Sequence, residues 1–253
     1  TWRGTKMENQ KLLSQTGVIM LGTNKNISAP FSSFLERKTN YSFKDTSFFF
    51  ELLSFSENKI VKKIKKKEIL FSEGDTANFL YRIESGKIKV FKSNNWGKEY
   101  IIDIYTTGDF LGYVALIGNR VHSESAVAIE DTEITVIHKA DFLNLLYSNK
   151  DVFTKFIKLL SSNYFEMEKR LLKLAYDSAK KKVAEALLFI SEKYQKNNKH
   201  ELAFSVVREN ISAIAGISHE SVSRTLTYFK EEGLIAGNNS NIKILDYKKL
   251  KEI

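Results

Sequence analysis

The stretch from Gly216 to Ile235, GISHESVSRTLTYFKEEGLI, has the features of a short capped helix that follows a tight turn. Gly216 can end a preceding helix in a left-handed conformation, and the Ser218 hydroxyl can accept a backbone N–H from the next helix. At 100° per residue, a helix from His219 to Glu231 separates its apolar and polar side chains onto opposite faces. The apolar face holds Val222, Leu226 and Phe229, and the polar face holds Glu220, Ser223, Arg224 and Thr227.

The residues on either side complete a winged helix-turn-helix pattern. A shorter helix is predicted from Glu209 to Ala215, with its apolar side chains directed inward. Residues 231–246, EEGLIAGNNSNIKILD, are typical of two short strands around an Asn-Ser turn. Two helices across a Gly-containing turn form a helix-turn-helix, whose second helix enters the major groove of DNA with its N-terminal half.

The side chains on the polar face suit the reading of bases. Arg224 can fork onto the O6 and N7 atoms of guanine, and Glu220 can accept from the amino group of cytosine. Lys243, in the predicted wing, can reach a phosphate, although a solvated lysine explains it nearly as well. The alternative for the whole face is a capped amphipathic helix that shows its charges only to water. The predicted DNA-binding residues are Ser218, His219, Glu220, Ser221, Ser223, Arg224, Thr227 and Lys243.

A long helix with a narrow apolar stripe is predicted before this domain. Its apolar residues recur in alternating steps of about four and three, the pattern of a two-stranded coiled coil. A helix that only packs on its own domain would also need an apolar stripe, but the strict alternation favours dimerisation. The predicted dimer seam consists of Phe153, Ile157, Leu160, Tyr164, Met167, Leu171 and Leu174. A further amphipathic helix is predicted from about Ala179 to Tyr194.

Short alternating segments between about Ile60 and His138 predict an all-β sandwich or barrel. Glycines separate these segments at regular intervals and are expected to supply positive φ angles at turns. The basic cluster from Lys62 to Lys67 is expected to be a solvated strand edge whose lysines discourage aggregation.

Composition limits the function classes. The chain has 253 residues, 43% hydrophobic residues, a net charge of +9 and no cysteine. The length allows two domains, and the positive charge favours an anionic partner, with a lysine-rich solvated surface as the alternative. Without cysteine there is no disulfide, thiolate zinc site or cysteine-bound iron–sulfur cluster. We find no apolar run long enough to span a membrane and no catalytic or metal-binding arrangement of residues, so no enzyme is predicted.

Two segments resemble the cyclic-nucleotide-binding β-roll, namely EGDTANFLYRIESGKIKVF and GDFLGYVALIG. Together with the long helix and the helix-turn-helix, the chain resembles the catabolite-activator and fumarate–nitrate-reduction regulator (CRP/FNR) superfamily over about residues 46–253. The resemblance implies a homodimer that binds a pseudo-palindromic site on double-stranded DNA and contacts RNA polymerase. In family members that bind cyclic AMP, a Glu takes the ribose hydroxyl and an Arg neutralises the phosphate.

The residues at these two places depart from that pattern. The Glu position is Tyr113 and the Arg position is His122, and a neutral imidazole is a poor substitute for a forked guanidinium. Arg120 could reach the phosphate only with a shift in register. Cyclic AMP is therefore possible but disfavoured, the effector is unknown, and His122 is expected to be a surface or turn histidine. The predicted effector-pocket residues are Gly112, Tyr113, Val114, Arg120, His122 and Ser123.

The reading helix resembles the fumarate–nitrate branch of the superfamily more than the catabolite activator. The Glu-x-x-Ser-Arg pattern of that branch is intact from Glu220 to Arg224, whereas the first Arg of the catabolite activator is replaced by His219. The resemblance implies half-sites closer to TTGA…TCAA than to TGTGA…TCACA. The iron–sulfur sensing of that branch cannot carry over to a chain without cysteine.

The sequence therefore predicts an α+β protein with a β-roll of the jelly-roll type, a long dimerisation helix and a C-terminal winged helix-turn-helix. The expected divisions are an N-terminal extension of unknown role (1–45), the β-roll (46–146), the dimer helix (147–177) and the DNA-binding domain (178–253). The predicted function is a cytoplasmic, homodimeric transcription regulator that responds to an effector. The alternative is a cyclic-nucleotide-binding module that controls a protein partner without reading DNA.

Overall fold

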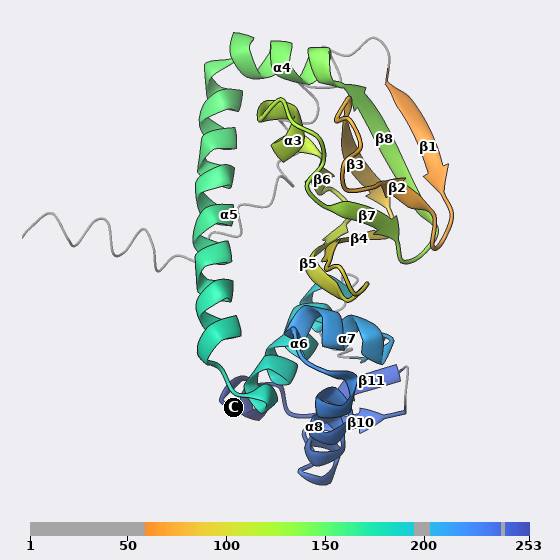
Figure 1. Ribbon diagram of the computed structural model, residues 1–253, viewed down its shortest axis with the longest axis vertical. Coiled ribbons are helices and arrows are strands. Elements are labelled where there is room, and N and C mark those ends of the chain that lie inside the picture. The colour runs from red at the N-terminus through yellow and green to blue at the C-terminus, as the bar shows by residue number, and fades with distance from the viewer. Residues whose placement is uncertain (1–58, 195–202, 239–240) are drawn as a thin grey trace, which may run out of the picture. The chain divides into compact units, whose positions relative to one another are not determined.

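The computed structural model describes residues 59–194, 203–238 and 241–253, and Figure 1 shows the order of their helices and strands. The predicted N-terminal extension 1–45 and the predicted Asn-Ser turn at 239–240 lie outside the described residues. None of the described helices is both long enough and apolar enough to cross a membrane.

Two antiparallel four-stranded sheets form the β-roll, as predicted. One sheet has the order β1-β8-β3-β6 and the other has the order β2-β7-β4-β5. In both sheets, apolar side chains alternate toward a shared interior that includes Ile83, Ile88 and Ile134. The strands are β1 (Ile60–Ile64), β2 (Ile69–Phe71), β3 (Phe79–Ser85), β4 (Lys87–Ser93), β5 (Glu99–Thr106), β6 (Phe110–Leu111), β7 (Ser125–Ala128) and β8 (Thr132–His138).

The glycines at the turns of the β-roll adopt the positive φ angles that the sequence predicted. Gly86, between β3 and β4, shows why no other residue fits. Its φ is 89°, and a Cβ atom there would lie 2.5 Å from the Oγ1 atom of Thr132. Any side chain would therefore force β8 away from the β3–β4 turn.

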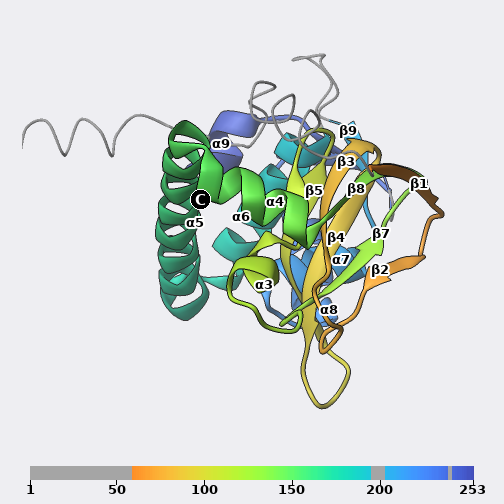
Figure 2. The ribbon, with the colours of Figure 1, turned by 90° about the horizontal axis from the view of Figure 1, so that it is seen from above.

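Two helices that the sequence did not predict, α3 (Tyr113–Ile117) and α4 (Lys139–Ser148), pack beside the β-roll. Their buried residues Tyr113, Leu116 and Phe142 share a core with Leu80 of β3. The long helix α5 (Lys150–Tyr176) contributes Val152, Phe156 and Leu159 to the same core. This shared core fixes the first half of α5 to the β-roll, and Figure 2 shows α4 leading into α5.

The C-terminal region is a three-helix core with a small sheet and a final short helix. Its elements are α6 (Ala179–Tyr194), β9 (Ala203–Ser205), α7 (Arg208–Ala215), α8 (His219–Glu231), β10 (Ile235–Gly237), β11 (Asn241–Ile244) and α9 (Tyr247–Lys251). Leu187, Ile211, Val222 and Phe229 meet in its core. The predicted wing of two strands is confirmed as β10 and β11, but β9 adds a third strand that the sequence did not indicate, giving the order β10-β11-β9.

Candidate DNA-binding surface and effector pocket

The turn between α7 and α8 is built as the sequence predicted. Gly216 ends α7 with φ 65° and ψ 30°, and its N–H donates to the Ser212 carbonyl at 2.9 Å. Ser218 caps α8 because its hydroxyl accepts the Ser221 N–H at 3.2 Å. The Ser212 hydroxyl donates to the Ile217 carbonyl at 2.6 Å and stabilises the turn from inside. These local bonds set the angle at which α8 leaves α7.

Helix α8 buries one face and exposes the other. Val222, Leu226 and Phe229 are buried in the core of the C-terminal region, together with Thr225, whose hydroxyl donates to the Ser221 carbonyl. The predicted polar face carries exposed His219, Glu220, Arg224 and Thr227, with half-buried Ser221 and Ser223. The structure therefore brings the predicted reading residues together along one side of α8.

The charged pair on this face is only weakly engaged within the protein. The Arg224 guanidinium lies 3.7 Å from the Glu220 carboxylate, and the two side chains are 72% and 78% exposed. Such a helical pair contributes only about 0.3–0.5 kcal/mol to stability. Both side chains can therefore turn to another partner at little cost. Lys243 is exposed on β11, in the predicted wing.

Helix α5 carries two sets of apolar residues, and only one of them is buried against the β-roll. Val152, Phe156 and Leu159 are buried against the β-roll. The predicted seam lies on other positions, and it remains open to solvent at Tyr164 (67% exposed) and Leu171 (62%). Phe153, Ile157 and Met167 are also exposed, whereas Leu160 and Leu174 are partly buried. Packing against the protein's own β-roll therefore does not account for the seam.

At the predicted effector pocket, Tyr113 is buried and already has a partner. The Asn163 side-chain amide of α5 donates to its phenol oxygen at 2.8 Å, and its ring packs edge-on against Phe156. Burial, with a smaller contribution from the Asp103 carboxylate, raises the pKa of the Tyr113 phenol to about 12. Tyr113 is thus a neutral link between α3 and the long helix.

The expectation that His122 is a surface or turn histidine is wrong. His122 is only 2% exposed, and its ring stacks on Phe71 with centroids 3.8 Å apart. Burial lowers the pKa of the imidazole, although Glu124 and Asp75 partly oppose this shift. Its Nδ1 atom is buried and has no hydrogen-bond partner among the described residues. The sequence did not indicate this burial because the stacking partner is on β2, distant along the chain.

The other predicted pocket residues differ in their placement. Gly112 has a φ of 88° and precedes α3, and Val114 points outward. Arg120 is exposed, and Ser123 is exposed and donates to the Glu124 carboxylate at 2.7 Å. The structure therefore buries Tyr113 and His122 and leaves Val114, Arg120 and Ser123 at the surface.

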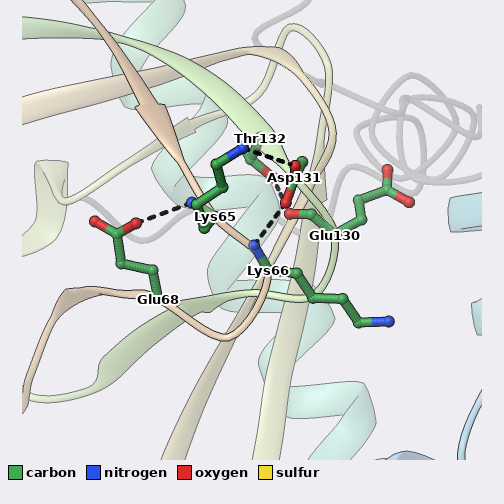
Figure 3. A network of polar contacts seen from close by, with 6 residues as sticks. All are labelled: Lys65, Lys66, Glu68, Glu130, Asp131 and Thr132. Atoms are coloured by element: carbon green, nitrogen blue, oxygen red, sulfur yellow. Dashed lines mark hydrogen bonds and ion pairs between the residues drawn. The ribbon is translucent and has the colours of Figure 1, made fainter.

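The lysine cluster at the start of the β-roll lies on a strand edge, as predicted. Among the described strands, β1 pairs only with β8, and Lys62 and Lys63 are exposed on it. Asp131 accepts from the Lys66 N–H at 2.9 Å and lies 3.3 Å from the Lys65 ammonium. Figure 3 shows these contacts as dashed lines. These bonds, the backbone one first, lower the pKa of the Asp131 carboxyl. The cluster thus stabilises a turn and presents charge to solvent.

No group of three or more His, Asp or Glu side chains in the described part of the chain could hold a metal ion. The described residues offer two surfaces for binding. The polar face of α8 presents hydrogen-bonding groups to an anionic partner, and the exposed apolar seam of α5 can pack against another apolar surface.

Comparison with known proteins agrees with this organisation. A family model of the cyclic nucleotide-binding domain matches residues 61–149, and one of the Crp-like helix-turn-helix domain matches residues 181–253. The chain is 30% identical over 184 residues to the cyclic AMP receptor protein of Thermus thermophilus, covering 73% of this chain and 83% of that protein. It is 26% identical over 194 residues to the transcriptional activator protein Anr of Pseudomonas protegens, covering 75% and 79%.

The chain belongs to the CRP/FNR family of bacterial transcription regulators. The structure of FixK2 from Bradyrhizobium japonicum has the same fold, with a TM-score of 0.68 at 21% identity over 77% of this chain and 96% of that one. The predicted fold class is therefore confirmed.

Sequence reasoning missed several residues that connect the parts of this CRP/FNR chain. Asn163 is polar and lies off the seam, so periodicity gave it no role. Phe71 lies in a short predicted strand segment, and nothing in the sequence indicated that it stacks on His122. A signal was available for Tyr113 and His122, which the sequence marked as departures from the family pattern.

Proposed function

We propose that the chain is a homodimeric, sequence-specific DNA-binding transcription regulator whose β-roll no longer uses the family's cyclic-AMP contacts. The observation that carries this proposal is the polar face of α8, where Glu220, Ser223 and Arg224 lie side by side on a capped helix. Arg224 would fork onto guanine and Glu220 would accept from cytosine, while Ser218 and Lys243 would contact phosphates.

The exposed seam of α5 supports the homodimer. An apolar stripe with a period of about 3.5 residues fits a second identical helix better than solvent. Residues such as Tyr164 and Leu171 would be covered in that pair. Two copies of α8 related by a two-fold axis would then read two half-sites about one helical turn apart on a pseudo-palindrome. RNA polymerase is the expected protein partner of a regulator bound at a promoter.

The residues present do not fit a cyclic nucleotide. A bound cyclic phosphate needs a permanent cation, but His122 is buried, stacked on Phe71 and shifted toward its neutral form. A ribose hydroxyl needs a free acceptor, but the Tyr113 phenol is neutral and is engaged by Asn163. We therefore propose that cyclic AMP is not the effector of this chain, although its relative in Thermus thermophilus is named a cyclic AMP receptor protein.

Selection of bound duplexes from a random pool, with and without cyclic AMP, tests the proposal. The expected result is enrichment of a TTGA-like inverted repeat that the nucleotide does not change. A TGTGA-like repeat that appears only with cyclic AMP would show that Tyr113 and His122 still admit the nucleotide. If no sequence is enriched while a protein partner is bound, the chain is a regulatory module that does not read DNA.

A further inference from the structure

Strand β5 contains a bulge at the point where it meets two helices. In the β4–β5 ladder, Val90 pairs with Asp103 and Phe91 pairs with Ile101, so Ile102 has no partner on β4. A bulge of this kind bends the strand and turns its side chains and carbonyl groups away from the regular ladder. Among the described strands, β5 is at the edge of its sheet, so its outer side faces neighbouring elements.

Cations from two different helices bind at this bulge. The guanidinium of Arg170, on α5, donates to the Ile102 carbonyl oxygen. The ammonium of Lys193, on α6, lies 2.8 Å from the Asp103 carboxylate. The Lys193 and Asp103 side chains are only 26% and 27% exposed, so water screens this pair less than it screens the Arg224–Glu220 pair. The bulge thus joins the proposed dimer helix and the first helix of the C-terminal region.

Apolar contacts surround these polar ones. Ile101 and Ile104 of β5 are buried against Ala213 of α7. The Phe189 ring of α6 lies 5.1 Å from the Arg170 guanidinium and 5.5 Å from the Lys193 ammonium. A cation near the face of an aromatic ring is attracted by the ring's negative face, so Phe189 favours both charges at this place. The C-terminal region therefore packs against β5 through α6 and α7.

The reading face of α8 takes no part in this contact. Its charged residues Glu220 and Arg224 stay highly exposed while α6 and α7 are seated on β5. The contact therefore does not cover the proposed DNA surface. What it restricts is the direction in which α8 points relative to α5.

We propose that the β5 bulge at Ile102 and Asp103 is a positioning element that selects the spacing between the two half-sites. This inference rests on the proposed function, because it needs a dimer that reads two half-sites. One extra base pair rotates one half-site relative to the other by about 35°. A dimer whose reading helices are fixed to α5 cannot follow that rotation, whereas one with loosely attached C-terminal regions can.

The test uses the full chain and the Asp103→Asn variant, which removes the charge that engages Lys193. Binding is measured to duplexes with the selected half-site spacing, with one base pair added or removed, and with a single half-site. For the unaltered chain we expect each altered spacing to weaken binding by about tenfold or more, the size of a mismatched base pair. For Asp103→Asn we expect this penalty to fall to about threefold or less, with single half-site affinity unchanged.

Glu99→Gln is the matched control. Glu99 lies on the same strand, loses the same charge on substitution, and pairs with Lys89 within the β4–β5 hairpin. It should keep the spacing penalty of the unaltered chain. The exchange of charges in Asp103→Lys with Lys193→Asp should restore part of the penalty if the pair itself is responsible. Unfolding curves for all variants identify any loss that comes from misfolding.

The outcomes separate this inference from the proposed function. If Asp103→Asn folds and keeps the full spacing penalty, the bulge is not a positioning element, and the proposed function stands. If Asp103→Asn weakens the single half-site as much as the full site, the residue acts on α8 itself and the inference is wrong. If the unaltered chain binds no sequence selectively, the proposed function fails and this inference fails with it.

Discussion

Replacement of Arg224 by alanine separates base reading from phosphate binding. The side chain is 72% exposed, and its contact with Glu220 spans 3.7 Å on the helix surface. Loss of such a pair costs about 0.3–0.5 kcal/mol, and alanine is a good helix former. The free energy of unfolding should therefore change by less than about 0.5 kcal/mol, so any larger effect on DNA binding arises at the DNA.

The expected loss of DNA-binding free energy follows from the number of Arg224–guanine contacts in the complex. An arginine forked onto guanine contributes about 1–3 kcal/mol of discrimination at its base pair. In a dimer that reads two half-sites, the loss is about 2–6 kcal/mol, or about 30-fold to 10⁴-fold in affinity. The loss of affinity should be confined to sites with the preferred base pair, because Arg224 makes no bidentate contact at the other base pairs that alanine could remove.

Fluorescence anisotropy with duplexes carrying each of the four base pairs at each half-site position measures this effect. Lys230→Ala serves as the control, because it removes one positive charge from the last turn of α8, away from the N-terminal half that carries the reading residues. The control should weaken all duplexes slightly and alike. Uniform weakening by Arg224→Ala would refute the reasoning, since it would show that Arg224 contacts only phosphate.

Three further predictions concern the helix seam and the β-roll. Leu171→Glu should convert the dimer to a folded monomer in analytical ultracentrifugation, because it places a charge in the seam, whereas the same change at the exposed neighbour Leu172 should leave the dimer intact. Phe156→Ala should lower the free energy of unfolding in urea by about 3–5 kcal/mol, because Phe156 is buried among α3, α4 and α5. Full retention of stability would contradict that packing. The pKa of His122 is lowered in the folded state, so its contribution to stability is complete above pH 6.5 and is lost as pH falls from 6.5 through the folded pKa. Denaturation curves at pH 7.5 and pH 5.5 should show a smaller acid loss for His122→Phe than for the unaltered chain, and equal losses would exclude this role.

Local rules explain why the reading helix could be predicted from the sequence. The cap at Ser218, the left-handed Gly216 and the period of Val222, Leu226 and Phe229 each act within a few residues. The structure reproduces the predicted bounds of α8 for that reason. The predicted roles of its polar residues in binding DNA remain predictions, because they depend on a partner.

Features set by contacts between distant segments could not be predicted in the same way. The sequence predicted a surface or turn histidine at His122, but the fold stacks its ring on Phe71 of β2. Strand β9 is too short to give a periodic signal and exists through its pairing with β11. The β5 bulge depends on the register between two strands, which no single stretch of sequence specifies.

The same distinction shows how this chain departs from its family. The proposed reading helix keeps the Glu-x-x-Ser-Arg pattern, while Tyr113 and His122, at the positions that we propose correspond to the family's nucleotide contacts, are buried and contact the protein's own side chains. The Asn163–Tyr113 hydrogen bond joins α3 directly to α5, and it needs no bound ligand to form. An effector that acts through the β-roll would therefore act in the presence of this link between α3 and the long helix. Regulation by population shift would require that the effector bind two conformations of the chain with different affinity.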